Sequence, residues 1–318
     1  MSAVHSDPAS ASESRRAPTI VQLVGGTPLV RIRRIATPAH IRIFAKLEYF
    51  NPGGSVKDRP ALQMVLDALA DGRLTPQKTL IDSTSGNTGV AYSWIGAAMG
   101  FPVALVMPAN VSVARKRITA AYGAKIIYSD PMEGSDGAIR KVRRLVEEEP
   151  DRYFYPDQYS NESNPRAHFL TTGEEIWKQT GGQVTHFVCG IGTGGTVMGT
   201  GRRLRQYRRE IRIIAVEPAE ALHGLEGLKH MPSSIVPSIY REAELDEKLS
   251  VGTEEGWDMA DRLLAEEGLL VGRSAGAAMV GAMRVARQLA TQGQTGTIVT
   301  LFPDRADRYF EPSPRDGG

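Results

Sequence analysis

Hydrophobic residues are arranged along the chain in two patterns, one typical of β-strands and one typical of α-helices. Short apolar runs predict strands at 41–47, 79–82, 103–107, 125–128, 185–189, 211–216, 269–271 and 297–302. Apolar residues spaced three to four apart predict helices at 60–74, 90–99, 112–122, 136–148, 173–179, 251–266 and 277–292, with an arginine-rich helix before residue 211. Strands alternating with helices predict an α/β fold with mostly parallel sheets and helices on both faces.

Composition and charge exclude several classes of protein. The 318 residues are enough for two domains, and Glu149-Pro150-Asp151 predicts a boundary near residue 150. The net charge of +2 gives no sign of an acidic partner, and the arginines of 202–212 alternate with apolar residues at helical spacing, which indicates a solvated helix face and no nucleic-acid site. The single cysteine, Cys189, excludes an internal disulfide and a multi-cysteine metal site, and its apolar surroundings predict a core position.

Neither a membrane span nor a secretion signal is expected. No segment approaches the run of about 20 apolar residues that a spanning helix needs. Residues 1–17 are rich in serine, alanine and charge, without the apolar centre of a signal peptide. These patterns predict a disordered tail at 1–17, a second short tail at 313–318, and a cytoplasmic protein.

The stretch 51–60 reads Asn-Pro-Gly-Gly-Ser-Val-Lys-Asp-Arg-Pro and places one lysine at the start of a predicted helix. The two glycines allow a sharp turn where larger side chains would clash. Lys57 is therefore expected at a fixed junction between loop and helix. A lysine that forms a Schiff base needs such a site, because only a desolvated, neutral amine is a nucleophile.

Two turns rich in glycine and hydroxyl residues each follow a predicted strand and open a predicted helix. The first, 84–88, reads Thr-Ser-Gly-Asn-Thr, and the second, 192–196, reads Gly-Thr-Gly-Gly-Thr. Free N–H groups at a helix N-terminus favour an anion. The second turn also fits the G-x-G-x-x-G dinucleotide pattern from Gly190, with Glu217 ending the next strand, so an NAD site is an alternative.

The stretch 272–276, Gly-Arg-Ser-Ala-Gly, has the form of a hydrolase nucleophile elbow. That catalytic arrangement needs a histidine later in the chain, and the last histidine is His230. The sequence therefore does not support a hydrolase.

The lysine loop and the turns that follow it, in this order, resemble those of the fold type II pyridoxal-phosphate enzymes. Within them, 51–60 is similar to the lysine loop of the cysteine synthase and cystathionine β-synthase family, including its B-type sulfhydrylases. The resemblance covers about residues 20–310. It implies pyridoxal 5′-phosphate as cofactor and two three-layer α/β/α domains, as in the tryptophan synthase β fold.

The resemblance also implies roles for individual residues. Lys57 would bind the cofactor as a Schiff base and act as the catalytic base. The cofactor phosphate would be held by Gly192, Thr193, Gly194, Gly195 and Thr196. The asparagine of the first turn, Asn87, would contact the ring hydroxyl, and Ser274 would support the cofactor. The substrate carboxylate would be held by Thr84, Ser85, Gly86 and Thr88, with Gln158 as a further contact.

Two assignments leave alternatives open. Asp304 stands where the family has a residue facing the pyridine nitrogen, and it would favour a protonated ring there. It could instead face Arg305 or Arg308. The loop 223–231 is similar to the loop that covers the active site in B-type cysteine synthases, and Lys229 would pair with the phosphate of O-phosphoserine. An exposed loop lysine is the alternative.

The implied reaction is β-replacement on O-acetylserine or O-phosphoserine. Sulfide or thiosulfate adds to an α-aminoacrylate and gives L-cysteine or S-sulfocysteine. The alternatives are cystathionine β-synthase, with homocysteine as nucleophile, and a catalytically silent carboxylate-binding scaffold. The expected partners are the amino-acid substrate, the sulfur donor and a second copy of the chain in a homodimer. By the same resemblance, 44–150 forms a smaller, mobile substrate-carboxylate domain, and 18–43 with 151–312 a larger cofactor domain.

Overall fold

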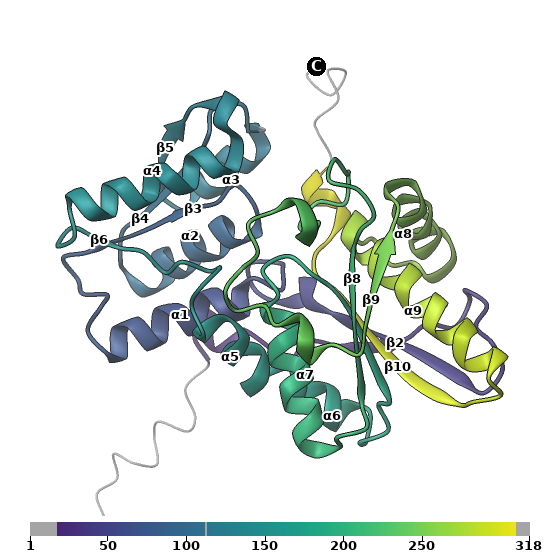
Figure 1. The fold of residues 1–318 in the computed structure, drawn as a ribbon. Helices are drawn as coiled ribbons and strands as arrows, with labels where there is room; N and C mark the ends of the chain where they lie inside the picture. The colour runs from purple at the N-terminus through teal and green to yellow at the C-terminus, as the bar shows by residue number, and fades with distance from the viewer. Residues whose placement is uncertain (1–17, 112, 310–318) are drawn as a thin grey trace, which may run out of the picture.

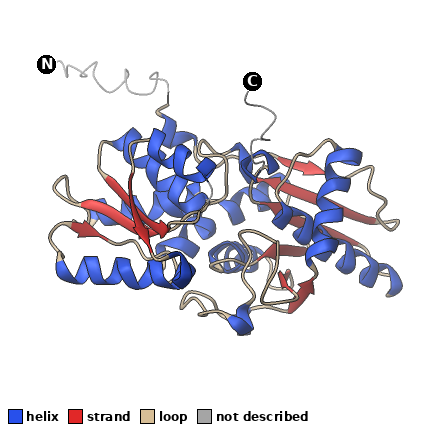
Figure 2. Cartoon of the chain, turned by 90° about the horizontal axis from the view of Figure 1, so that it is seen from above, coloured by secondary structure: helices blue, strands red, loops and turns tan. Residues whose placement is uncertain are grey.

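The chain forms two sheets, each covered by helices on both faces (Figures 1 and 2). The structure is a computed structural model, and it describes residues 18–111 and 113–309. The predicted tails at 1–17 and 313–318 lie outside the described residues. The α/β fold class predicted from the sequence is confirmed by these parallel sheets and their helical layers.

The larger sheet has six strands in the order β1-β2-β10-β7-β8-β9. Its strands are β1 (Leu29–Arg31), β2 (Ile41–Leu47), β7 (His186–Gly190), β8 (Arg212–Pro218), β9 (Glu247–Val251) and β10 (Gly296–Phe302). β1 is antiparallel to β2, and the other neighbours are parallel. β2 and β10, from opposite ends of the chain, pair along their whole length, so the lysine loop after β2 meets the segment after β10 (Figure 1).

The smaller sheet has four parallel strands in the order β5-β4-β3-β6. They are β3 (Thr79–Ser83), β4 (Val103–Pro108), β5 (Lys125–Ser129) and β6 (Tyr153–Phe154). The 84–88 turn leaves the carboxyl end of β3, one of the two inner strands of this sheet. Loops at the carboxyl ends of parallel strands form the binding crevice of such folds.

The helices build a separate core on each face of each sheet. On the smaller sheet, α1 (Asp58–Ala70) and α2 (Asn87–Met99) cover one face and α4 (Gly134–Glu148) the other. On the larger sheet, α8 (Thr253–Glu267) and α9 (Arg273–Thr291) cover one face, and α6 (Thr172–Gln179) and α7 (Gly195–Tyr207) the other. The remaining α-helices are α3 (Val113–Ala121) and α5 (Ser163–Leu170), and α5 packs on α7.

Short 3₁₀ helices connect these elements. They are η2 (Ile20–Leu23), η3 (Glu48–Phe50), η4 (Pro131–Glu133), η5 (Met231–Ser233), η6 (Glu242–Glu244) and η7 (Ala306–Tyr309).

Several predicted elements need correction. The strand predicted at 269–271 is wrong, because that segment is an irregular link that follows the left-handed Gly268 and leads into α9. The helix predicted from residue 251 begins at Thr253, since Val251 ends β9. The sequence analysis missed β1, β6, β9 and α5. These elements are short or polar, and neighbouring elements hold them in place more than their own apolar period does.

The strands extend past the boundaries predicted at residues 44 and 150. All of β2 belongs to the larger sheet, and β6 completes the smaller one. The division into two domains stays a prediction.

The described part of the chain contains no helix that is long and apolar enough to cross a membrane. The arginines of α7 largely contact acidic residues of neighbouring elements. Arg202 pairs with Glu244 at 2.8 Å, and Arg203 pairs with Glu174 at 2.7 Å. These pairs fit the interpretation of this helix as a solvated, charged face.

Candidate active site

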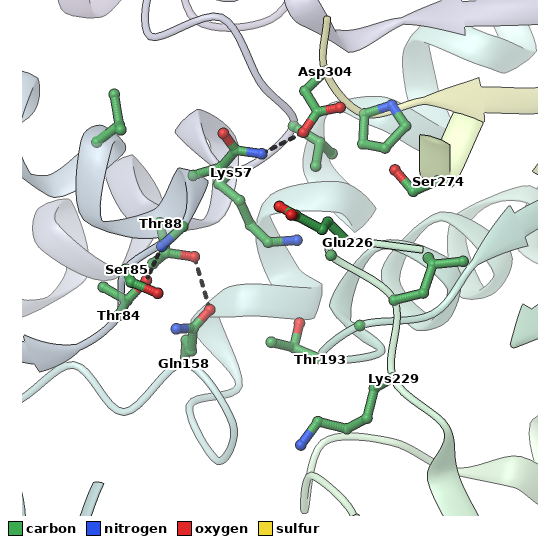
Figure 3. A pocket seen from close by; sticks show the side chains of 18 of the residues that line it. Lys57, Thr84, Ser85, Thr88, Gln158, Thr193, Glu226, Lys229, Ser274 and Asp304 are labelled. Carbon is green, nitrogen blue, oxygen red and sulfur yellow. Dashed lines mark hydrogen bonds between the residues drawn. The ribbon is translucent and has the colours of Figure 1, made fainter. Parts of the chain in front are cut away.

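A cavity of about 360 Å³ lies between the two sheets and contains Lys57. Its walls come from the lysine loop, the 84–88 turn, the 192–196 turn, the loop 226–229, and the segment after β10 (Figure 3). Both turns open helices, α2 and α7 respectively. Two helix N-termini therefore face the cavity that contains Lys57.

Lys57 occupies the N-cap position of α1, as the sequence predicts. The turn before it is closed by Asp58, whose carboxylate accepts hydrogen bonds from Gly53 N at 2.5 Å and from Trp94 Nε1 at 3.0 Å. Burial lowers the pKa of Lys57 below its usual value, and Asp304 offsets this only in part. Among the described residues, no carboxylate forms an ion pair with its amine, and its burial favours the neutral form that acts as a nucleophile or base.

A buried ion network anchors the helix that carries Lys57. Arg59 forms ion pairs with Glu48 and Glu175, each at 2.6 Å, and Lys46 pairs with Glu175 at the same distance. Glu48 also accepts a hydrogen bond from Asn51, the first residue of the lysine loop. This network ties the loop to β2, η3 and α6 of the larger sheet.

The 84–88 turn lines the cavity with hydroxyl-bearing residues at the N-terminus of α2. Thr88 donates a hydrogen bond of 2.9 Å to the side-chain oxygen of Gln158, and both side chains are buried. Asn87 lies at the first position of α2, where its amide nitrogen donates to Asp304 at 2.6 Å. The amide oxygen of Asn87 accepts a hydrogen bond of 2.7 Å from Arg308, which fixes the amide orientation.

The 192–196 turn approaches the loop 226–229 so closely that glycine is required. A Cβ at Gly192 would lie 2.5 Å from the carbonyl oxygen of Gly227. The hydroxyls of Thr193 and Thr196 line the cavity. Backbone N–H groups, hydroxyls and the N-terminus of α7 together suit a phosphate group.

Asp304 is buried, and its two carboxylate oxygens differ in their hydrogen bonds. Oδ2 accepts hydrogen bonds from Asn87 and from the hydroxyl of Tyr309, whereas Oδ1 has no partner among the described residues. Burial raises the pKa of Asp304. Neither predicted arginine donates a hydrogen bond to it, because Arg305 lies 3.4 Å from Asp307 and Arg308 donates to Asn87 and Gly53.

Lys229 lines the cavity, and its amine points away from that of Lys57 (Figure 3). The amine lies 5.1 Å from the ring centre of Tyr159 and donates a hydrogen bond of 3.4 Å to the carbonyl oxygen of Ile235. Burial lowers its pKa. The amine of Lys229 therefore lies at the cavity wall, apart from the amine of Lys57.

The structure brings together nearly all residues that the sequence singled out. Those lining the cavity are Lys57, Thr84, Ser85, Gly86, Asn87, Thr88, Gln158, Gly192, Thr193, Gly194, Thr196, Lys229, Ser274 and Asp304. Gly195 does not line it and instead packs against Asn164. Arg308 was named from the sequence only as an alternative partner of Asp304, and Tyr309 and Glu226 were not expected in the wall. The basic and aromatic residues after 304 were a usable signal for the first two.

Glu217 does not serve as a nucleotide ligand here. It is buried at the end of β8, accepts a hydrogen bond from Met231 N at 3.2 Å, and lies 3.3 Å from Lys248. It is also outside the cavity wall. The dinucleotide interpretation therefore lacks its acidic residue.

A buried lysine amine between two anion-binding turns defines a class of site: it suits a phosphorylated aldehyde together with an amino-acid carboxylate. The comparisons agree with this class. The family model for pyridoxal-phosphate dependent enzymes matches residues 20–304, and the chain belongs to this family.

Its relatives include cysteine synthases. A cysteine synthase of Aquifex aeolicus (strain VF5) is 54% identical, covering 92% of this chain and 90% of the relative. Cysteine synthase B of Pseudomonas aeruginosa is 39% identical, covering 94% and 98%. Among solved structures, O-acetyl serine sulfhydrylase isoform 3 from Entamoeba histolytica matches with a TM-score of 0.88 and 34% identity, over 99% of this chain and 97% of that one. The predicted family and its cofactor, pyridoxal phosphate, are confirmed.

The residues present fit this cofactor. The 192–196 turn lines the cavity with Thr193 and Thr196 at the N-terminus of α7, which suits a phosphate, and Lys57 offers an amine to an aldehyde. The unpartnered Oδ1 of buried Asp304 needs a donor such as a protonated ring nitrogen. Ser274, buried at the first turn of α9, is a second polar group in this wall.

Proposed function

We propose that the protein is a cysteine synthase that replaces the β-substituent of an O-activated L-serine with a sulfur nucleophile. The observation that carries this proposal is the position of Lys57. Its amine lies in one cavity with both the 84–88 turn and the 192–196 turn. The relatives named cysteine synthase support the same reaction.

Each group of residues has a task in this reaction. The 192–196 turn binds the phosphate of the cofactor through N–H groups and the hydroxyls of Thr193 and Thr196. The 84–88 turn binds the substrate carboxylate, with Gln158 holding Thr88 in place. Pyridoxal phosphate, when bound, supplies an electron sink for charge at the substrate Cα. Lys57 removes the Cα proton and later returns it to the same carbon.

The leaving group and the nucleophile exchange at the β-carbon. The C–O bond to acetate or phosphate breaks, and a C–S bond forms with sulfide or thiosulfate, which gives L-cysteine or S-sulfocysteine. Lys229 is the proposed cation for a departing phosphate, because it is the lysine of the 226–229 loop that lines the cavity.

Closure of the smaller domain and a homodimer complete the proposal. The two sheets have separate cores, which supports movement of the smaller sheet and its helices relative to the larger sheet. Such closure would bring the 84–88 turn onto the substrate and exclude water. The homodimer is the expectation drawn from the family resemblance, and sedimentation of the holoenzyme at two concentrations tests it.

The test is a product assay with matched substrates. The holoenzyme is given O-acetyl-L-serine or O-phospho-L-serine, each with sulfide, thiosulfate or homocysteine, and products are identified by mass spectrometry. We expect cysteine from sulfide with at least one of the two serine esters. Faster formation of cystathionine than of cysteine would support the cystathionine β-synthase alternative. A protein that binds pyridoxal phosphate but forms no product would be a catalytically silent scaffold.

A further inference from the structure

Helix α5 packs directly against the helix that carries the 192–196 turn (Figure 1). The contact is so close that a Cβ at Gly195, the first residue of α7, would lie 1.9 Å from Oδ1 of Asn164. The sequence analysis did not predict α5. It nevertheless directs two polar side chains, Asn164 and His168, at the back of the turn, and both are buried.

The hydroxyl of Thr193 can act toward the cavity only as a hydrogen-bond donor. Its oxygen accepts a hydrogen bond of 3.1 Å from Asn164 Nδ2 and one of 3.4 Å from Gly195 N. A hydroxyl has two acceptor lone pairs and one donor proton, so both lone pairs are occupied. The same Nδ2 group donates to the carbonyl oxygen of Gln158 at 2.8 Å. That acceptor-only partner fixes which end of the Asn164 amide faces Thr193.

The hydroxyl of Thr196 has a matching partner in His168. Nε2 of His168 lies 3.2 Å from Oγ1 of Thr196, and Nδ1 lies 2.9 Å from Oγ1 of Thr172. Burial, assisted by the charge of Arg59, lowers the pKa of His168 to about 3, so the ring is neutral. A neutral imidazole donates from one nitrogen and accepts at the other, and two tautomers are therefore conceivable.

We infer that α5 orients both hydroxyls of the 192–196 turn as hydrogen-bond donors toward a bound phosphate. Asn164 does so for Thr193. His168 does so for Thr196 by carrying its proton on Nε2, while Nδ1 accepts a hydrogen bond from Thr172. Asn164 and His168 are thus positioning residues, because they act through the threonines and do not line the cavity. The inference rests on the proposed function, in which this turn holds the cofactor phosphate.

The chemical reason is that a phosphate offers only acceptor oxygens to the turn. If His168 carried its proton on Nδ1, Thr196 would have to donate to Nε2 and would present a lone pair to the anion. That arrangement repels the phosphate and leaves it one hydrogen bond short. The Nε2–H tautomer avoids both the repulsion and the lost hydrogen bond. With this tautomer, the two threonine hydroxyls favour ligands that only accept hydrogen bonds.

The first test needs no substitution. The holoenzyme with ¹⁵N-labelled histidine is examined by long-range ¹H–¹⁵N correlation, which reports which ring nitrogen of His168 carries the proton. We expect Nε2–H in the pyridoxal-phosphate-bound protein. A proton on Nδ1 overturns the inference and leaves the proposed function untouched.

The second test compares pyridoxal phosphate with pyridoxal, which has the same ring and aldehyde but no phosphate. His168→Leu should weaken binding of pyridoxal phosphate to the apoenzyme by about ten- to a hundred-fold, the range for losing a hydrogen bond to a charged group, and leave pyridoxal binding unchanged. His168→Gln, which keeps an amide donor, should restore most of the loss. The matched control is His186→Leu, because His186 contacts Thr185 and lies outside the cavity.

The outcomes separate the two claims. Equal losses for both ligands would mean a structural effect, and equal affinities in all variants would mean no effect; either result overturns the inference. Where His168→Leu fails to fold, Thr193→Val and Thr193→Ser give the same comparison, with only the serine variant retaining affinity for pyridoxal phosphate. If the unaltered protein binds no pyridoxal phosphate at all, the proposed function falls together with the inference.

Discussion

Replacing Glu48 with glutamine tests whether the buried ion network holds the lysine loop in place. Glu48 is fully buried, and its two oxygens accept hydrogen bonds from Arg59 at 2.6 and 2.9 Å, from Thr27 at 2.7 Å and from Asn51 at 3.0 Å. Glutamine keeps the shape of the side chain and removes its charge. Arg59 is then left with Glu175 as its remaining carboxylate.

The magnitude follows from the pKa of Glu48. Burial alone would raise it, but the charge and hydrogen bonds of Arg59 lower it from 4.5 to about 2. This difference corresponds to about 3 kcal/mol of folding free energy at neutral pH. Breaking a buried ion pair from one side costs about 3–5 kcal/mol, which is a similar value. The folded-state pKa is depressed, so the stabilisation is complete above pH 4.5 and is lost as the pH falls toward 2.

The assay is urea unfolding of the apoenzyme with and without Glu48→Gln, followed by circular dichroism. We expect the difference in unfolding free energy to be about 3 kcal/mol at pH 7 and to shrink to about 2 kcal/mol at pH 3.5. Glu149→Gln is the matched control, because its ion pair with Arg152 is exposed and should have no measurable effect. A difference for Glu48→Gln that is small at pH 7, or that does not change with pH, would show that the ion pair of Glu48 with Arg59 does not stabilise the fold in this way.

Three further substitutions probe the cavity wall. Gly192→Ala should weaken pyridoxal phosphate binding by about tenfold or more, because its Cβ would meet the carbonyl oxygen of Gly227 at 2.5 Å; unchanged affinity in equilibrium dialysis would count against this close approach. Lys229→Met should lower kcat/KM for O-phospho-L-serine by about tenfold and spare O-acetyl-L-serine, and equal losses would contradict a phosphate contact. Asp304→Asn should lower the pKa of the cofactor ring nitrogen, because the variant removes the carboxylate oxygen that has no partner among the described residues. The pKa is measured by ¹⁵N NMR with labelled cofactor. An unchanged pKa would mean that another residue contacts the ring nitrogen, and Ser274 would be the next candidate.

The buried strands at the centre of the fold can be predicted from the sequence because they consist mostly of apolar residues. β4 and β10 are buried on both faces and consist mostly of apolar residues, so their places are visible without tertiary information. The predicted strand at 269–271 has the same apolar character but no neighbouring strand to pair with. Edge strand β9, Glu-Lys-Leu-Ser-Val, carries charge, and its hydrogen bonds to β8 define it.

The candidate site also has parts that the sequence predicts and parts that only the folded chain defines. Lys57 and the two turns are contiguous motifs, so residue order alone predicts that they matter. The contacts of α5 with the 192–196 turn cross 28 or more positions of sequence and depend on the close packing that Gly195 permits. Arg308 reaches Asn87 across 221 positions. No local pattern encodes such pairs, and only the folded chain brings them together.

Reductive trapping of the cofactor tests directly whether Lys57 is the lysine that binds pyridoxal phosphate. The protein is incubated with pyridoxal phosphate, reduced with borohydride, digested and analysed by peptide mass spectrometry, with Lys57→Ala in parallel. The account predicts a reduced cofactor adduct on Lys57, and no adduct in the cavity of the variant. An adduct on Lys229 in place of Lys57, or a protein that takes up no cofactor, would contradict it.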